Sequence, residues 1–285
     1  MNRQLNDDEC DNRNTQESNL LPKWLWSFQK WTFVVNIVVQ MCCLVFNIVT
    51  VVVQNRRDSN PVGSLLNTVL WLETVVQAVE LFWYVLVAGL LISNPNRSIK
   101  TFYRYLDWVI TTPTMLVNLV LLIRYFHDPS ASVGEVVDEE LGRIVVAVFC
   151  DVAMLCIGFF TEIVKYKKCT GYAALSKTPE ENKTTNNKNV SKYGLELTHL
   201  MGFSFFIFAF LPSLIAAINN PSTEGWIVWG ASFGVWSLYG VTHVCFPYRS
   251  NAHVRNGCYN VLDILSKNAF GIVVSAVALH RTRSL

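Results

Sequence analysis

The sequence "YNVLDILSKNAFG", Tyr259 to Gly271, lies inside an otherwise apolar run near the C-terminus. It places Asp263 and Lys267 four residues apart, so on an α-helix the two charges face the same way. Ionisable side chains are rare in such runs unless they are paired or functional. Two interpretations follow: a structural ion pair, or a reactive lysine with its counterion.

The rest of the chain has the composition of a membrane protein. Of its 285 residues, 52% are hydrophobic and 15% are charged, and its mean hydropathy is +0.31, which is too apolar for an ordinary soluble domain. A membrane-spanning helix needs about 20 apolar residues. Seven segments qualify: residues 31–54, 64–93, 102–125, 143–165, 197–218, 225–246 and 257–279. We therefore expect an all-α membrane protein, a bundle of seven transmembrane helices.

The chain divides into a polar extension (1–28), the helical bundle (29–281) and a short tail (282–285). The extension lacks the basic start and apolar core of a cleaved signal peptide. Arginines beside the spans favour a cytoplasmic first loop and C-terminus: Arg56, Arg57, Arg281 and Arg283. We expect a multi-pass plasma-membrane protein with its N-terminus outside, although the lysine-rich segment 165–192 favours the opposite orientation.

Composition and motifs also exclude several classes of function. The net charge of +2 gives no reason to expect a nucleic-acid partner. No nucleotide, metal or hydrolase motif rises above chance, so we do not expect an enzyme.

Polar residues inside the spans form stripes. Three spans carry them at offsets of four, seven and eleven: Asn36, Gln40, Cys43 and Asn47; Glu73, Gln77, Glu80 and Tyr84; Asn256, Asn260, Asp263 and Lys267. The third span adds Arg104, Asp107, Thr111 and Asn118 on a single side. At 100° per residue each set forms one narrow line. Isolated amides often act only as interhelical contacts, but four stripes that include several charges favour a hydrated pathway.

Two motifs carry a family resemblance. "RYLDWVITTP" (104–113) and "LDILSKNAFG" (262–271) resemble the microbial rhodopsins, whose retinal is bound as a Schiff base to a lysine of the seventh helix. The resemblance implies all-trans retinal on Lys267, with Asp107 and Asp263 balancing the protonated Schiff base. It also implies a pocket formed by Trp108, Thr112, Met115, Met154, Gly158, Trp236, Tyr239 and Ser266.

The second span narrows the resemblance. "ETVVQAVELFW" (73–83) is similar to the glutamate-bearing second helix of the channelrhodopsins, and Asn268 follows the lysine as it tends to do in them. By that resemblance Glu80 and Asn268 form a central constriction with a polar residue of the first helix, and Glu73 forms a cytoplasmic one. Glutamates along a pore favour cations. We expect a light-gated ion channel that passes protons and monovalent cations.

The same resemblance implies that Thr112 and Asp151 bridge the third and fourth helices. It also implies a homo-oligomer, because dimers and trimers both occur among the relatives. The full set of ion-pathway candidates is Asn36, Gln40, Asn47, Glu73, Gln77, Glu80, Arg104, Thr111, Asn118, Asp151, Arg255 and Asn268.

Three alternatives stay open. In a light-driven proton pump Asp107 would accept the proton, but Asn118 stands at the donor position and its amide does not titrate. Arg255 and Asn256 also stand where pumps usually carry glutamates. An anion channel can retain one glutamate such as Glu80. A sensory rhodopsin needs a transducer, and only "HRTRSL" follows the last span.

Two charged features have simpler interpretations. We expect Glu162 at a helix end, in the headgroup region. We expect the acidic run "GEVVDEELGR" (134–143) to form a solvated loop before the fourth helix.

The Schiff-base assignment gives a direct prediction. The variant Lys267→Ala has no amine to form the imine, so it is expected to show no visible absorption after retinal is added. An absorption spectrum of the purified protein tests this, and a pigment that survives the substitution contradicts the assignment.

Overall fold

The computed structural model describes residues 23–57, 64–93, 102–175, 185–246 and 252–284. Most of the expected polar extension, residues 1–28, lies outside the described residues. The described helices are α2 (Lys23–Arg57), α3 (Leu65–Ser93), α4 (Phe102–His127), α5 (Val133–Leu175), α6 (Thr185–Asn219), α7 (Thr223–Cys245), α8 (Ala252–Asp263), η2 (Ile264–Asn268) and α9 (Ala269–Ser284).

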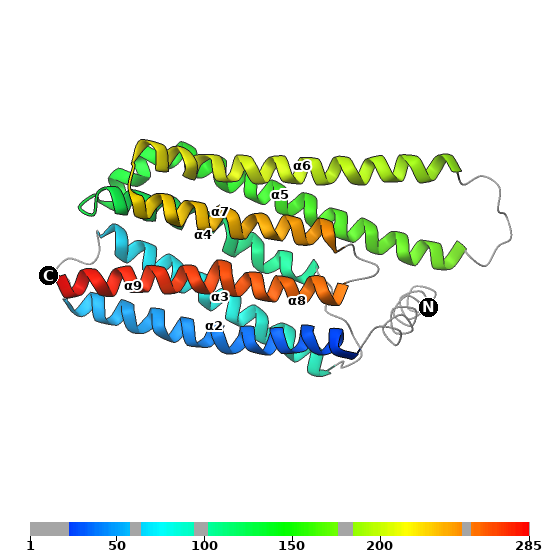
Figure 1. Cartoon of the computed structure of the whole chain (residues 1–285), viewed down its shortest axis with the longest axis horizontal. Helices are drawn as coiled ribbons and strands as arrows, with labels where there is room; N and C mark the ends of the chain where they lie inside the picture. Colours follow the sequence, from blue (N-terminus) through cyan, green and yellow to red (C-terminus); the bar gives the residue numbers. More distant parts are fainter. Residues whose placement is uncertain (1–22, 58–63, 94–101, 176–184, 247–251, 285) are drawn as a thin grey trace.

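The helices lie side by side along one common direction, and α8, η2 and α9 form a single rod (Figure 1). This rod packs against α2 and α3 on one side and α7 on the other, which closes the bundle. Helix α4 contacts α3, α5, α6 and α7, so its side chains reach the interior from several directions. The predicted bundle of seven transmembrane helices is confirmed.

Within the described residues, six helices are long and apolar enough to cross a membrane. Helix α7 is not among them. Its 23 residues extend roughly 34 Å at 1.5 Å per residue, which is enough for about 30 Å of hydrocarbon. Its composition explains the difference, because glycine, serine, threonine and tryptophan interrupt the apolar residues of "TEGWIVWGASFGVWSLYG" and lower its hydropathy.

The acidic run 134–143 is not a loop, and that expectation was wrong. Helix α5 already begins at Val133. The hydroxyl of Ser132 accepts a hydrogen bond from the Glu135 amide at 3.3 Å, and the Glu135 carboxylate accepts one from the Ser132 amide at 3.1 Å. This reciprocal capping box stabilises the start of α5, and the acidic residues that follow it lie at the positive end of the helix dipole. The helix therefore begins before the apolar span that was expected from residue 143.

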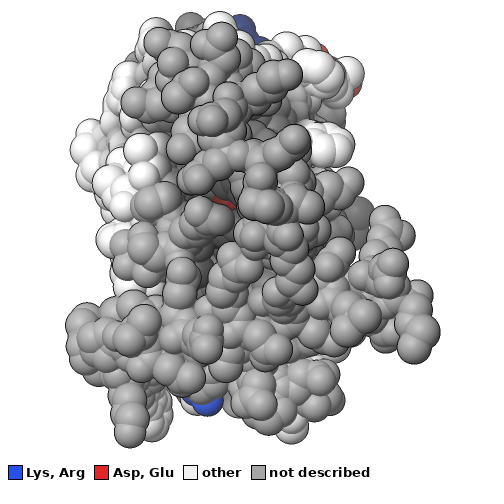
Figure 2. Space-filling view, turned by 90° about the vertical axis from the view of Figure 1, so that its right-hand side faces the viewer, with Lys and Arg blue, Asp and Glu red and all other residues white. Residues whose placement is uncertain are grey.

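The end of the bundle at which α2 begins is turned toward the viewer in Figure 2. A small area of Asp or Glu is visible near the middle of that face. The opposite end carries the C-termini of α2 and α9 (Figure 1).

A buried ion pair joins α5 to α8. Glu162, expected in the headgroup region, is only 2% exposed. It accepts hydrogen bonds from Arg255 Nη1 at 2.9 Å and Nη2 at 3.3 Å, and Arg255 is fully buried. The expectation for Glu162 is corrected, because it lies inside the bundle. Arg255 joins α8 to α5 through this pair, and its place on the ion path stays a prediction. A buried charge is kept when a partner on a facing helix satisfies it.

This pair should matter for stability. Arg255→Met leaves Glu162 buried without its cation, which is expected to lower the free energy of unfolding by about 3–5 kcal/mol. Denaturant unfolding in detergent, followed by loss of helix, measures the change. The double variant Glu162→Gln/Arg255→Met should lose less.

The control is Glu139→Gln, because Glu139 pairs with Arg124 at 2.6 Å but its side chain is 59% exposed. Its effect should stay below about 1 kcal/mol. Equal stability of Arg255→Met and the unsubstituted protein would contradict the role assigned to the pair.

Candidate functional site

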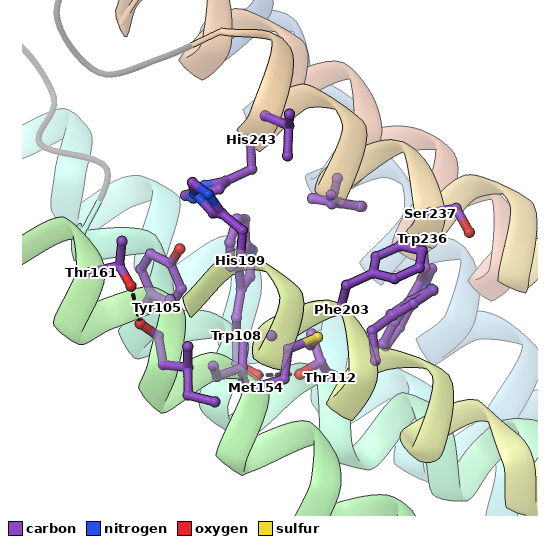
Figure 3. Close-up of a pocket in the computed structure, with 18 of the residues that line it drawn as sticks. Tyr105, Trp108, Thr112, Met154, Thr161, His199, Phe203, Trp236, Ser237 and His243 are labelled. Atoms are coloured by element: carbon purple, nitrogen blue, oxygen red, sulfur yellow. Dashed lines mark hydrogen bonds between the residues drawn. The ribbon is translucent and has the colours of Figure 1, made fainter. Parts of the chain in front are cut away.

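A cavity of about 440 Å³ lies between α4, α5, α6, α7 and η2 (Figure 3). Its walls include nine of the residues predicted to surround the cofactor: Trp108, Thr112, Met115, Met154, Gly158, Trp236, Tyr239, Ser266 and Lys267. Its volume and its mostly apolar, aromatic lining are those of a small-molecule site with a few polar groups.

Further lining residues are not among the candidate cofactor-binding residues given above. In Figure 3, Phe203 lies beside Trp236 on one side of the cavity and Trp108 lies on another. His199 and His243, with ring centroids 5.2 Å apart, border a third side. Tyr105 and Tyr259 complete the wall. Tyr259 is the first residue of "YNVLDILSKNAFG", and its position two helical turns before Lys267 was the available signal.

Gly158 allows Tyr105 to reach the cavity. A Cβ at this glycine would stand 2.7 Å from the Tyr105 ring, closer than two carbon atoms can approach. Tyr105 packs edge-on against Trp108 at 5.3 Å. The predicted glycine therefore acts through a wall residue, by making room for an aromatic side chain.

Lys267 projects between two carboxylates. Its Nζ donates a hydrogen bond to Asp107 Oδ2 at 2.8 Å and lies 3.6 Å from Glu80 Oε1. All three side chains are almost completely buried. The structure thus brings Lys267 and Asp107 together, and it adds Glu80 where the second counterion was expected to be Asp263.

Asp263 is engaged elsewhere. Both Asp263 and Lys267 are described residues one helical turn apart, but no ion pair joins them. Asp263 is bonded to other side chains, and Lys267 donates its hydrogen bond to Asp107. Lys267 itself lies in η2, a π-helical turn in which the Ala269 amide bonds to the Ile264 carbonyl five residues back.

The partners of Asp263 come from three helices. Its Oδ2 accepts hydrogen bonds from Arg104 at 2.9 Å and from the Tyr84 hydroxyl at 2.5 Å. Its Oδ1 accepts one from the Tyr239 hydroxyl at 2.7 Å, and that hydroxyl lies 2.8 Å from Ser266 Oγ. Asp263, four residues before Lys267, therefore joins α4, α3 and α7 through Arg104, Tyr84 and Tyr239.

Thr112 and Asp151 meet as expected across α4 and α5. The Thr112 hydroxyl lies 2.6 Å from Asp151 Oδ2 and also donates toward the Trp108 carbonyl at 2.8 Å. Thr111 lies beside Asp107 but donates to its main-chain carbonyl, at 3.1 Å, and not to its carboxylate.

The polar stripes of α2, α3 and α4 meet on one side of Lys267, around Gln77 and Glu73. Gln40 donates to the Gln77 side chain at 2.8 Å, and Gln77 donates to Glu73 at 2.8 Å. Asn118 reaches the same carboxylate at 3.3 Å. Farther along, Asn47 accepts a hydrogen bond from Ser275 of α9 at 2.7 Å.

On the other side of Lys267, Asn36 continues the line. Its amide donates to the Tyr84 hydroxyl at 2.8 Å and to the Asn260 main chain at 3.0 Å. The Asn260 side chain in turn accepts a hydrogen bond from Arg104. The predicted stripes thus face one another along much of the described bundle.

Glu80 and Asn268, both described residues, were expected to touch, but no hydrogen bond joins them. Both are buried, and neither oxygen of Glu80 and neither polar atom of the Asn268 amide has a hydrogen-bond partner. Further unpartnered atoms lie along the same stripes: Asn36 Oδ1, Gln40 Oε1, Asn47 Nδ2 and Asp107 Oδ1. Buried polar atoms of this kind are usually satisfied by ordered water.

Comparisons with known proteins agree with this geometry. The family described as bacteriorhodopsin-like protein matches residues 27–280. A search of curated proteins gives no match.

Solved structures are similar in fold. The viral rhodopsin OLPVRII superimposes with a TM-score of 0.64 at 24% identity, over 88% of this chain and 98% of that one. Thermophilic rhodopsin gives 0.63 at 14% identity, over 93% and 97%. Bromide-bound halorhodopsin from Halobacterium salinarum gives 0.61 at 14% identity, over 90% and 97%.

The chain therefore belongs to the bacteriorhodopsin-like family, the microbial rhodopsins. It is a multi-pass membrane protein whose chromophore is retinal. The residues present fit that group, because the cavity is apolar and aromatic and the amine and carboxylate needed for a protonated Schiff base meet beside it.

Proposed function

We propose that the protein is a light-gated cation channel, with retinal attached to Lys267. The observation that carries the proposal is the position of Glu80. Its carboxylate lies 3.6 Å from the Lys267 amine and belongs to the stripe of α3 that faces α2 and α9. One residue thus belongs both to the surroundings of the chromophore and to the polar interior.

In this proposal, bound retinal supplies a photoisomerisable protonated imine. Asp107 accepts the hydrogen bond of the Lys267 nitrogen and balances its charge, and Glu80 is the second carboxylate within ion-pair distance. Asp263 keeps Arg104 in place, so that a second buried cation is also balanced. Without these partners either cation would be costly in the membrane interior.

The proposed ion path follows the stripes of α2, α3, α4 and the α8–α9 rod. The unpartnered atoms along them offer binding sites for water, and water joining them on illumination would connect Asn36 to Asn47 through Glu80 and Gln40. Glu73 and Glu80 line this route and favour cations over anions.

A proton pump is the second candidate, and one observation favours it. Asn118 cannot donate a proton, but it hydrogen-bonds Glu73 at 3.3 Å. A titratable carboxyl therefore stands next to the donor position and could return a proton to the Lys267 nitrogen.

We also propose that the N-terminus is outside and that the protein assembles as a homo-oligomer in the plasma membrane. Support for the orientation comes from Arg56 and Arg281, which lie near the C-termini of α2 and α9, at the same end of the bundle (Figure 1). Cationic ends of spans favour the cytoplasmic side.

Voltage-clamp recording of cells that express the protein separates the candidates. A cation channel is expected to give a photocurrent that reverses sign with voltage, at a potential that follows the sodium or proton gradient. Replacing chloride outside the cell is the control and should leave the reversal potential unchanged.

A reversal potential that follows chloride would instead identify an anion channel. Outward current at zero voltage without reversal would identify a pump, and a pigment that passes no current would favour a sensor. Each of these results overturns the proposed cation channel.

A further inference from the structure

Gln77 joins the retinal-bearing turn to the carboxylate of the predicted cytoplasmic constriction. The side chain is fully buried in α3. Its Nε2 donates to the main-chain carbonyl of Lys267 at 3.0 Å and to Glu73 Oε1 at 2.8 Å. Its Oε1 accepts a hydrogen bond from Gln40 at 2.8 Å. A single amide therefore connects η2, α3 and α2.

The place where Gln77 touches the seventh helix is unusual. Lys267 lies in the π-helical turn η2, which interrupts two α-helical segments. Such a turn can change its hydrogen-bond register without unfolding the helix around it, and that is a common feature of functional sites. The Lys267 carbonyl thus lies in the one described segment of the seventh helix where the α-helical hydrogen-bond register is interrupted.

Gly271 makes the junction sterically feasible. A Cβ on this residue would stand 3.0 Å from Gln77 Nε2, 3.0 Å from Glu73 Oε1 and 3.2 Å from Asn47 Nδ2. Those separations are tighter than ordinary van der Waals contact. The glycine, four residues after Lys267, therefore leaves the space in which the amide and the carboxylate meet the rod.

We propose that Gln77 is a positioning residue that couples movement of Lys267 to the hydrogen bonding of Glu73. The inference deepens the proposed function and rests on it for the consequence, which is opening of the path at Glu73. Hydrogen bonds fail beyond about 3.5 Å. A shift of the Lys267 main chain therefore either moves the Gln77 amide away from Glu73 or breaks its bond to η2.

Either outcome alters the Glu73 carboxyl, which is also held by Asn118 at 3.3 Å. A residue that served only as interhelical packing would need a single contact between two helices. Gln77 instead contacts both the chromophore-bearing residue and the carboxylate of the constriction. Its two donated bonds give a physical link between them, as coupling between sites requires.

The test is light-minus-dark infrared difference spectroscopy on the pigment reconstituted with retinal. The band of the Glu73 carboxyl group is assigned by its loss in Glu73→Gln. In the unsubstituted protein this band is expected to change on illumination. In Gln77→Leu the change should be lost. The absorption maximum should stay close to that of the unsubstituted protein, because the hydrogen bond from Gln77 to Lys267 goes to the main-chain carbonyl and not to the amine that binds retinal.

Gln54→Leu is the matched control. Gln54 is also buried in the bundle, at 3% exposure on α2, and its Oε1 has no hydrogen-bond partner. The same substitution there should leave the light response of the Glu73 band intact. If Gln77→Leu yields no pigment, Gly271→Ala is the second variant to measure. Its added methyl group should disturb the Glu73 band by steric contact with Gln77 and Glu73.

Photocurrent provides the second measurement. Gln77→Leu should reduce it roughly tenfold per pigment molecule, within the range of coupling between two sites. An unchanged Glu73 response in Gln77→Leu, or the absence of any response in the unsubstituted protein, overturns the coupling. A response that depends on Gln77 in a protein that passes no current upholds the coupling and overturns the channel.

Discussion

The contact between Lys267 and Asp107, 2.8 Å apart and almost completely buried, constrains the rest of the bundle. A cation in the membrane interior must be balanced nearby, and this requirement explains why α4 lies at the centre and why Glu80 faces the rod. Arg104 adds a second buried cation, which Asp263 balances at 2.9 Å. Three carboxylates thus surround two cations, so displacement of Lys267 alters the balance of charge for all of them.

The same constraint separates the two candidate transport modes. A pump moves one proton between defined groups, and the Glu73–Asn118 contact supplies one such group. A channel needs a continuous wettable line. The unpartnered atoms of Asn36, Glu80, Gln40 and Asn47 lie on stripes of α2 and α3 that face the α8–α9 rod. Their arrangement is the stronger argument, because it extends to both sides of Lys267.

Much of this fold was predictable, since apolar length fixes the spans and helical spacing fixes which polar residues share a face. The retinal family followed from two motifs, and the resemblance to that family gave nine of the residues that line the cavity. The direct partners of Asp263 could not be predicted from "LDILSKNAFG", because Arg104, Tyr84 and Tyr239 come from three other helices. The burial of Glu162 against Arg255 was missed because 93 positions separate the partners, and the spacing of one helix says nothing about its neighbour. The start of α5 could have been predicted from the capping-box pattern of Ser132 and Glu135. The acidic run that follows was instead interpreted as a solvated loop.

The central claim is that the interior between α2, α3 and α9 becomes water-filled in the light. Asn47, fully buried and bonded to Ser275, lies on this line. The most direct measurement is the rate at which a charged, membrane-impermeant thiol reagent, applied from the cytoplasmic side, inhibits the photocurrent of Asn47→Cys. The unsubstituted protein, which already carries Cys42 and Cys43, sets the background. Inhibition is expected to be faster in the light than in the dark. Equal rates in light and dark, or no inhibition above background, would contradict the central claim.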